Sequence, residues 1–125
     1  MSGDWTWLQT IAQTEIDLIL RSLPAKLTAK VGNLPITFES RPRAALRCDG
    51  IEPDTLGLFV GEPFAESGTT STPTPPQIIL FLQNIWEAAE RDEDYFREEV
   101  RTTFLHELGH YLGLDESDLE ERGLD

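Results

Sequence analysis

The two histidines of the chain lie four residues apart, at His106 and His110, in the segment His-Glu-Leu-Gly-His. Residues four apart on an α-helix lie on the same side, so both imidazoles can converge on one metal ion. Glu107 follows the first histidine, and its carboxylate can contact a metal-bound water without ligating the metal. The metal lowers the pKa of that water towards about 7, and the carboxylate can take its proton and pass it to a leaving amine. The pattern predicts a metal site with Glu107 as the catalytic base.

A catalytic zinc site typically has three protein ligands and one open position, so the two histidines need a further ligand. Gly113 can adopt a left-handed conformation and turn the chain back after the helix. The residue three positions beyond it is Glu116, and its neighbour Asp115 competes for the same role. We therefore expect His106, His110 and Glu116 to bind the metal. Neutral imidazoles and one carboxylate suit Zn²⁺, and these ligand types also allow iron or manganese.

A long helix is predicted to carry this motif, from a cap at Asp92 to Leu112, with Gly113 as its C-terminal stop. At about 100° per residue, His106 and His110 point away from the apolar face of this helix. That face consists of residues that recur at steps of three and four: Phe96, Val100, Phe104, Leu108 and Tyr111.

Further elements must position this helix. An N-terminal helix is predicted to begin after Asp4 and to end before Pro24. The capping pattern that starts at Ser117 predicts a short C-terminal helix. Strands are expected at residues 34–39, 56–60 and 77–82, and helical turns at residues 24–31 and 84–91. The last strand is a continuous apolar run, which is typical of the middle of a sheet.

Other side chains of the motif helix are also capable of chemistry. Tyr95 and Tyr111 can polarise a carbonyl, although an aromatic residue at helical spacing is more often part of the core. Arg97 and Arg101 can bind a substrate carboxylate, although salt bridges to the many nearby acids are the commoner outcome. We therefore expect structural roles for these residues.

The composition is that of a soluble globular protein. The 125 residues predict a single domain over positions 1–125. Asp and Glu number 23 against 10 Lys and Arg, and the net charge of -13 argues against nucleic acids and anionic membranes as partners. The longest apolar stretch, residues 78–82, is far too short to cross a bilayer. The lone cysteine, Cys48, and the absence of a signal-peptide pattern predict a cytoplasmic location.

The segment from His106 to Glu116 looks like the zincin metallopeptidases, and residues 100–114 resemble more closely the small stand-alone bacterial zincin-like metallopeptidase family. Residues 56–63 and 76–81 support this resemblance. The resemblance implies a minimal zincin-like α+β fold, in which a small mixed β-sheet packs against the active-site helix. It also implies zinc held by the two histidines and an acid, with Glu107 as general base.

The same resemblance implies that an edge strand binds extended peptide by strand addition, and residues 56–60 are the closest equivalent in this chain. Family members often have Asp at the position of the third ligand, where this chain has Glu116. The only methionine is Met1, so the methionine turn of the metzincins is missing.

These observations predict a cytoplasmic, zinc-dependent metallopeptidase, a hydrolase that acts on peptide or protein substrates. A second hypothesis is a metal-binding interaction or regulatory module with vestigial or narrow activity, and the small size of the chain motivates it. A third is a metal-dependent ribonuclease with an H-x-x-x-H-x-x-G-x-x-H pattern. The net charge of -13 and the carboxylate of Glu116 count against the ribonuclease.

Overall fold

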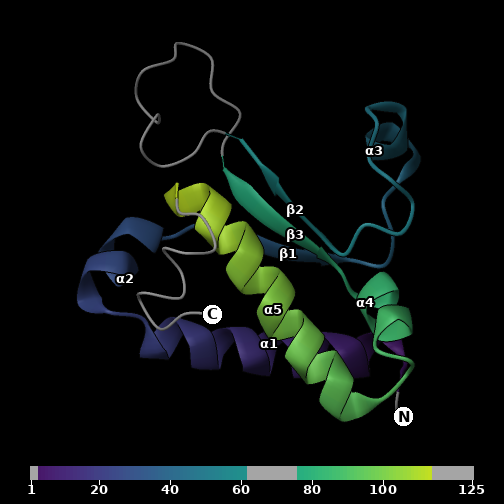
Figure 1. Cartoon of the computed structure of the whole chain (residues 1–125), viewed down its shortest axis with the longest axis horizontal. Helices are drawn as coiled ribbons and strands as arrows, with labels where there is room; N and C mark the ends of the chain where they lie inside the picture. The colour runs from purple at the N-terminus through teal and green to yellow at the C-terminus, as the bar shows by residue number, and fades with distance from the viewer. Residues whose placement is uncertain (1–2, 62–75, 114–125) are drawn as a thin grey trace.

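The computed structural model describes residues 3–61 and 76–113, which form five α-helices and one three-stranded sheet (Figure 1). This confirms the predicted α+β class with a small mixed sheet. The expected C-terminal helix after Ser117 lies outside the described residues. In chain order the elements are α1 (Trp5–Ser22), α2 (Ala25–Val31), β1 (Ile36–Glu39), α3 (Ala44–Cys48), β2 (Gly57–Val60), β3 (Gln77–Phe81), α4 (Leu82–Ala88) and α5 (Glu93–Leu112).

The sheet has the strand order β1-β3-β2, so β3 is the central strand, as predicted. The strands β1 and β3 are parallel and pair Ile36 with Ile78, whereas β2 and β3 are antiparallel and pair Leu58 with Ile79. Four of the residues of β3 are buried, which agrees with its continuous apolar sequence. Both outer strands, β1 and β2, are short and have a free edge among the described residues.

The N-terminal helix α1 begins where the sequence predicts. The Asp4 carboxylate accepts a hydrogen bond from the N–H of Trp7 at 2.8 Å, which satisfies one of the free amides of the first turn. The helix ends at Ser22, before Pro24. Its buried side packs against α4 and α5 (Figure 1) and includes Leu8, Ile11, Ala12, Ile16 and Ile19.

The motif helix α5 crosses one face of the sheet and packs against β2 and β3 (Figure 1). The Asp92 carboxylate caps it by accepting from the N–H of Tyr95 at 3.0 Å. Gly113 ends it in a left-handed conformation with φ of 73°, as predicted. The predicted apolar face is buried, and its residues Phe96, Val100 and Phe104 are completely inaccessible to solvent.

Two short helices differ from the sequence-based expectations. Helix α4 begins at Leu82, directly after β3 and two residues earlier than the predicted turn, because Leu82 is buried in the same core as the strand. Helix α3 was not predicted, since it has no buried residue and therefore no apolar periodicity that would reveal it. Among the described residues, no helix is long and apolar enough to span a membrane.

Candidate metal centre

The motif residues lie in the last two turns of α5. His106, Glu107 and His110 each offer one ligand atom, and these atoms lie within 4.8 Å of one another. The two imidazole rings are close, with centroids 4.5 Å apart and ring planes inclined at 61°. Helical spacing therefore brings the two nitrogen donors to one place, as the sequence predicts.

The three motif residues differ sharply in burial. Both histidines are exposed, and the side chain of His110 is 52% accessible, whereas that of Glu107 is only 11% accessible. The nearer carboxylate oxygen of Glu107, Oε1, is 3.6 Å from Nδ1 of His110, which is longer than a hydrogen bond. The histidines thus face solvent, whereas the glutamate between them in the sequence is largely buried.

A glycine of the edge strand allows Glu107 to be buried. A Cβ atom placed on Gly57 would lie 3.3 Å from Cγ of Glu107 and only 2.6 Å from Cγ2 of Thr103. Any side chain at position 57 would therefore require Thr103, or the packing of β2 on α5, to shift at the turn that bears the motif. The role of Gly57 was not predicted, although a glycine inside a strand is a signal of close backbone approach.

The start of β2 is fixed by a buried amide. Nδ2 of Asn84 donates to the carbonyls of Pro53 and Thr55, at 2.8 and 2.9 Å, in the segment that leads into the strand. Its Oδ1 accepts from Arg41 at 2.8 Å, and Arg41 also forms a two-pronged ion pair with Glu87 at 3.0 and 2.7 Å. These contacts join α4, the chain after β1 and the chain before β2, so they help to place Gly57 against α5.

The donor chemistry of the cluster fits a divalent metal. Two imidazoles at helical spacing provide nitrogen ligands that zinc, iron and related ions accept. The solvent-exposed position of the histidines leaves room for further ligands. Glu116, the predicted third ligand, and its competitor Asp115 lie outside the described residues.

The two tyrosines of α5 lie at opposite ends of the helix, and they differ in burial. Tyr111 is 7% exposed, its hydroxyl donates to the carbonyl of Lys30 at 3.3 Å, and its ring lies 5.7 Å from that of Phe59. Burial raises the pKa of the Tyr111 hydroxyl. Tyr95 lies at the opposite end of the helix and is 57% exposed. The expected core role is therefore correct for Tyr111 and wrong for Tyr95.

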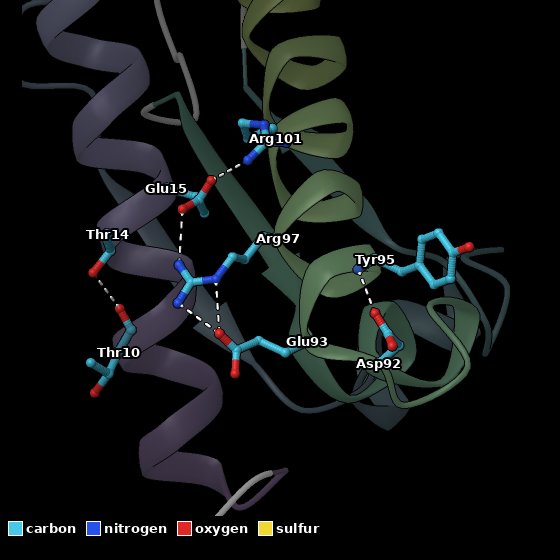
Figure 2. A network of polar contacts seen from close by, with 8 residues as sticks. All are labelled: Thr10, Thr14, Glu15, Asp92, Glu93, Tyr95, Arg97 and Arg101. Carbon is cyan, nitrogen blue, oxygen red and sulfur yellow. Dashed lines mark hydrogen bonds and ion pairs between the residues drawn. The ribbon is translucent and has the colours of Figure 1, made fainter.

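The two arginines of α5 bind a buried carboxylate, as Figure 2 shows. Glu15 of α1 is 4% exposed and forms ion pairs with Arg101 and with Arg97, the latter at 3.1 Å. Arg97 also contacts Glu93 at 3.0 Å, and this hydrogen bond is the main cause of its raised pKa. The expected salt-bridge role of both arginines is confirmed, and it fastens α1 to the motif helix.

Comparison with known proteins gives one family. The model of the family described as zincin-like metallopeptidase matches residues 31–124, which is more than half of the chain. The match includes the whole sheet and α5, whereas α1 precedes it. No curated protein matches the chain.

Proposed function

The chain belongs to the zincin-like metallopeptidase family, and we propose that it is a zinc-dependent peptidase that hydrolyses peptide bonds. The observation that carries this proposal is the cluster at the end of α5, where ligand atoms of His106, Glu107 and His110 lie within 4.8 Å of one another. An apolar core does not explain two exposed histidines at this spacing beside a buried glutamate, and the contact of Glu107 with His110 leaves His106 unexplained.

In this proposal His106 and His110 bind the zinc through imidazole nitrogens, and Glu116 completes the set. Zinc so held would supply Lewis acidity, which lowers the pKa of a coordinated water and polarises the carbonyl of the scissile peptide. The histidines are suited to this role because they lie on the exposed side of α5, where a substrate has access.

Glu107 is the general base and then the general acid. A carboxylate oxygen takes the proton of the attacking water, and the same oxygen returns it to the nitrogen of the leaving amine. The stem of Glu107 lies beside Gly57 and the residue is buried, so the side chain has few rotamers available. Its Oε1 atom is thereby held on the side of His110, 3.6 Å from Nδ1.

The substrate would bind along β2. This strand is an edge of the sheet and its residue Gly57 packs against the motif helix, so a peptide that pairs with β2 runs close to Glu107. An extended peptide or an unfolded protein segment is therefore the expected class of substrate.

We further propose that α1 belongs to the same domain as the matched region, so that residues 1–125 form one unit. The support is the packing of α1 on α5 together with the ion pairs of Glu15. A separate N-terminal domain would not share a core with the motif helix.

The test is hydrolysis of a diverse peptide library, followed by mass spectrometry, with the protein in zinc-loaded, chelated and reloaded states. We expect cleavage in the loaded state, its loss after chelation and its return with zinc. Cleavage that persists after complete removal of the metal would contradict a metal-dependent mechanism. A lack of cleavage across the library would favour a metal-binding interaction module instead.

A further inference from the structure

A polar groove lies on the side of α1 that faces away from α5. Its volume is about 540 Å³, and Ile36 and Phe38 of β1 line it together with one face of α1. Figure 2 shows Thr10 and Thr14 on this side of the helix, opposite to Glu15. The residues of α1 that line the groove are Thr6, Gln9, Thr10, Gln13, Thr14 and Asp17.

The backbone of β1 presents hydrogen-bonding groups at this edge that have no partner among the described residues. The carbonyl of Pro35 accepts a hydrogen bond from the N–H of Ile78 at 3.0 Å. Backbone direction alternates along a strand, so Thr37 and Glu39 also direct their N–H and C=O groups at β3. Ile36 and Phe38 lie between these residues, and they direct their N–H and C=O groups away from β3. No other described strand lies on that side of β1. These two residues are also the two residues of β1 that line the groove.

The face of α1 over the groove offers acceptor oxygens. The hydroxyls of Thr10 and Thr14 donate to the backbone carbonyls four residues earlier, at 2.9 and 3.0 Å, so their lone pairs remain for a ligand. Gln13 donates to the carboxylate of Asp17 at 2.9 Å. Among the described residues that line the groove there is no lysine or arginine.

We propose that this groove binds an extended, basic segment of a partner protein, which pairs with β1 as a fourth strand of the sheet. The backbone of the segment forms hydrogen bonds with the N–H and C=O groups of Ile36 and Phe38. Alternate side chains of such a strand point to the same side, and those that face α1 are Lys or Arg in contact with Thr10, Thr14 and Asp17. The basic character follows from the acceptor-rich lining and from the net charge of -13, which attracts cations.

The groove is separate from the proposed catalytic edge. The strand β1 is on one side of β3, whereas β2, which packs against Glu107, is on the other side. A partner in the groove therefore leaves the metal centre accessible. This inference does not depend on catalysis, because the pairing partner of β1 is recognised by α1 and β1 alone.

The probe is a synthetic hexapeptide of alternating Lys and Val with blocked ends, added to the full chain. Residue-resolved amide hydrogen exchange should show the amides of Ile36 and Phe38 slowed by about tenfold or more. The amides of Thr37 and Glu39 point towards β3, so they should change less. A peptide of alternating Glu and Val, and a Lys–Val peptide with methylated backbone nitrogens, should both fail to protect these amides.

Two matched variants locate the site. The Thr10→Lys variant places a cation in the groove and should abolish the protection, whereas Leu18→Lys adds the same charge on the exposed part of α1 and should retain it. Circular dichroism should give the wild-type helical spectrum for both variants, so that a lost protection is not a loss of fold. Zinc content should not alter the result.

Unchanged exchange at Ile36 and Phe38 in the presence of the Lys–Val peptide would overturn the proposal. So would protection confined to residues 57–60, which would place the peptide on β2 instead. Protection that rises with protein concentration in the absence of peptide would also overturn it, because a second copy of the chain would then occupy β1.

Discussion

Gly57 of β2 lies beside Glu107 of α5, and a side chain on the glycine would crowd the stem of the glutamate. A Cβ on Gly57 would be 3.3 Å from Cγ of Glu107, 3.2 Å from Cδ2 of Leu80 and 2.6 Å from Cγ2 of Thr103. The edge strand and the motif helix therefore lie close together at the turn of α5 that bears Thr103 and Glu107. The shape of the candidate site depends on this contact.

The Gly57→Ala substitution should destabilise the fold by roughly 1–3 kcal/mol, as overpacking of a core commonly does. It should also lower peptide hydrolysis, since α5 must move at the turn that holds Glu107. Chemical denaturation measures the first effect and the peptide assay measures the second.

The control for this prediction removes the clashing methyl group. The double variant Gly57→Ala/Thr103→Ser should be more stable than Gly57→Ala alone, although Thr103→Ser by itself loses a buried methyl worth about 1 kcal/mol. A double variant whose loss of stability equals the sum of the two single losses would show that the 2.6 Å contact is not the cause.

The Glu15 ion pairs should stabilise the junction of α1 and α5. The Glu15→Gln substitution removes the charge and leaves Arg97 and Arg101 partly in water, so we expect a loss of roughly 1–3 kcal/mol. The double variant Arg97→Gln/Arg101→Gln leaves a buried, unpaired carboxylate and should cost more, roughly 3–5 kcal/mol.

The surface pair of Arg43 and Glu39 is a suitable control for these variants, because its atoms are 3.8 Å apart and Arg43 is well exposed. The Arg43→Gln substitution should change the free energy of unfolding by less than about 1 kcal/mol. If Glu15→Gln, Arg97→Gln/Arg101→Gln and Arg43→Gln lowered the free energy of unfolding equally, the special role of Glu15 would be contradicted.

Acid should weaken the pair of Arg41 and Glu87. The hydrogen bond from Arg41 lowers the pKa of Glu87 below its ordinary value of 4.5. A carboxylate with a lowered pKa in the folded state contributes stability above its unfolded pKa and loses it as the pH falls through the folded pKa. The difference in unfolding free energy between wild type and Glu87→Gln should therefore shrink below about pH 4.5.

Denaturation curves from about pH 7 to about pH 3 measure this change. Arg41→Gln should remove the same pH dependence, since it removes the donor that lowers the pKa of Glu87. If the difference in unfolding free energy between wild type and Glu87→Gln stayed constant across the acid range, the lowered pKa of Glu87 would be contradicted.

The elements that have local signals could be predicted from the sequence. Helix α5 begins and ends as expected because Asp92 and Gly113 have capping chemistry that acts within one turn. The position of β3 follows from its uninterrupted apolar run. Helix α3 has no buried residue, so the hydrophobic pattern gave no signal for it.

The contacts between distant segments could not be predicted. Glu15 is one of 23 acidic residues, and no local pattern indicates that it pairs with arginines 82 and 86 positions away. No local pattern indicates either that Asn84 donates hydrogen bonds to the chain before β2. The cluster of motif residues was predicted correctly because a helix fixes the distance between residues four apart.

The third ligand can be assigned by a matched pair of variants. Glu116→Ala should weaken zinc binding by more than the roughly 10–100-fold that is typical for the loss of an outer-shell partner. Asp115→Ala should leave the affinity almost unchanged. Competition with a fluorescent zinc chelator measures the zinc affinity of both variants. A larger loss of affinity in Asp115→Ala than in Glu116→Ala would make Asp115 the third ligand.

The central claim is that Glu107 moves the proton while the histidines bind the metal, and Glu107→Gln tests it most directly. Zinc stoichiometry and peptide hydrolysis are measured on the same sample, with His106→Ala as the variant that should lose the metal. Our account predicts that Glu107→Gln retains one zinc per chain and loses hydrolysis by at least about 10²-fold. Wild-type turnover by zinc-loaded Glu107→Gln would contradict it.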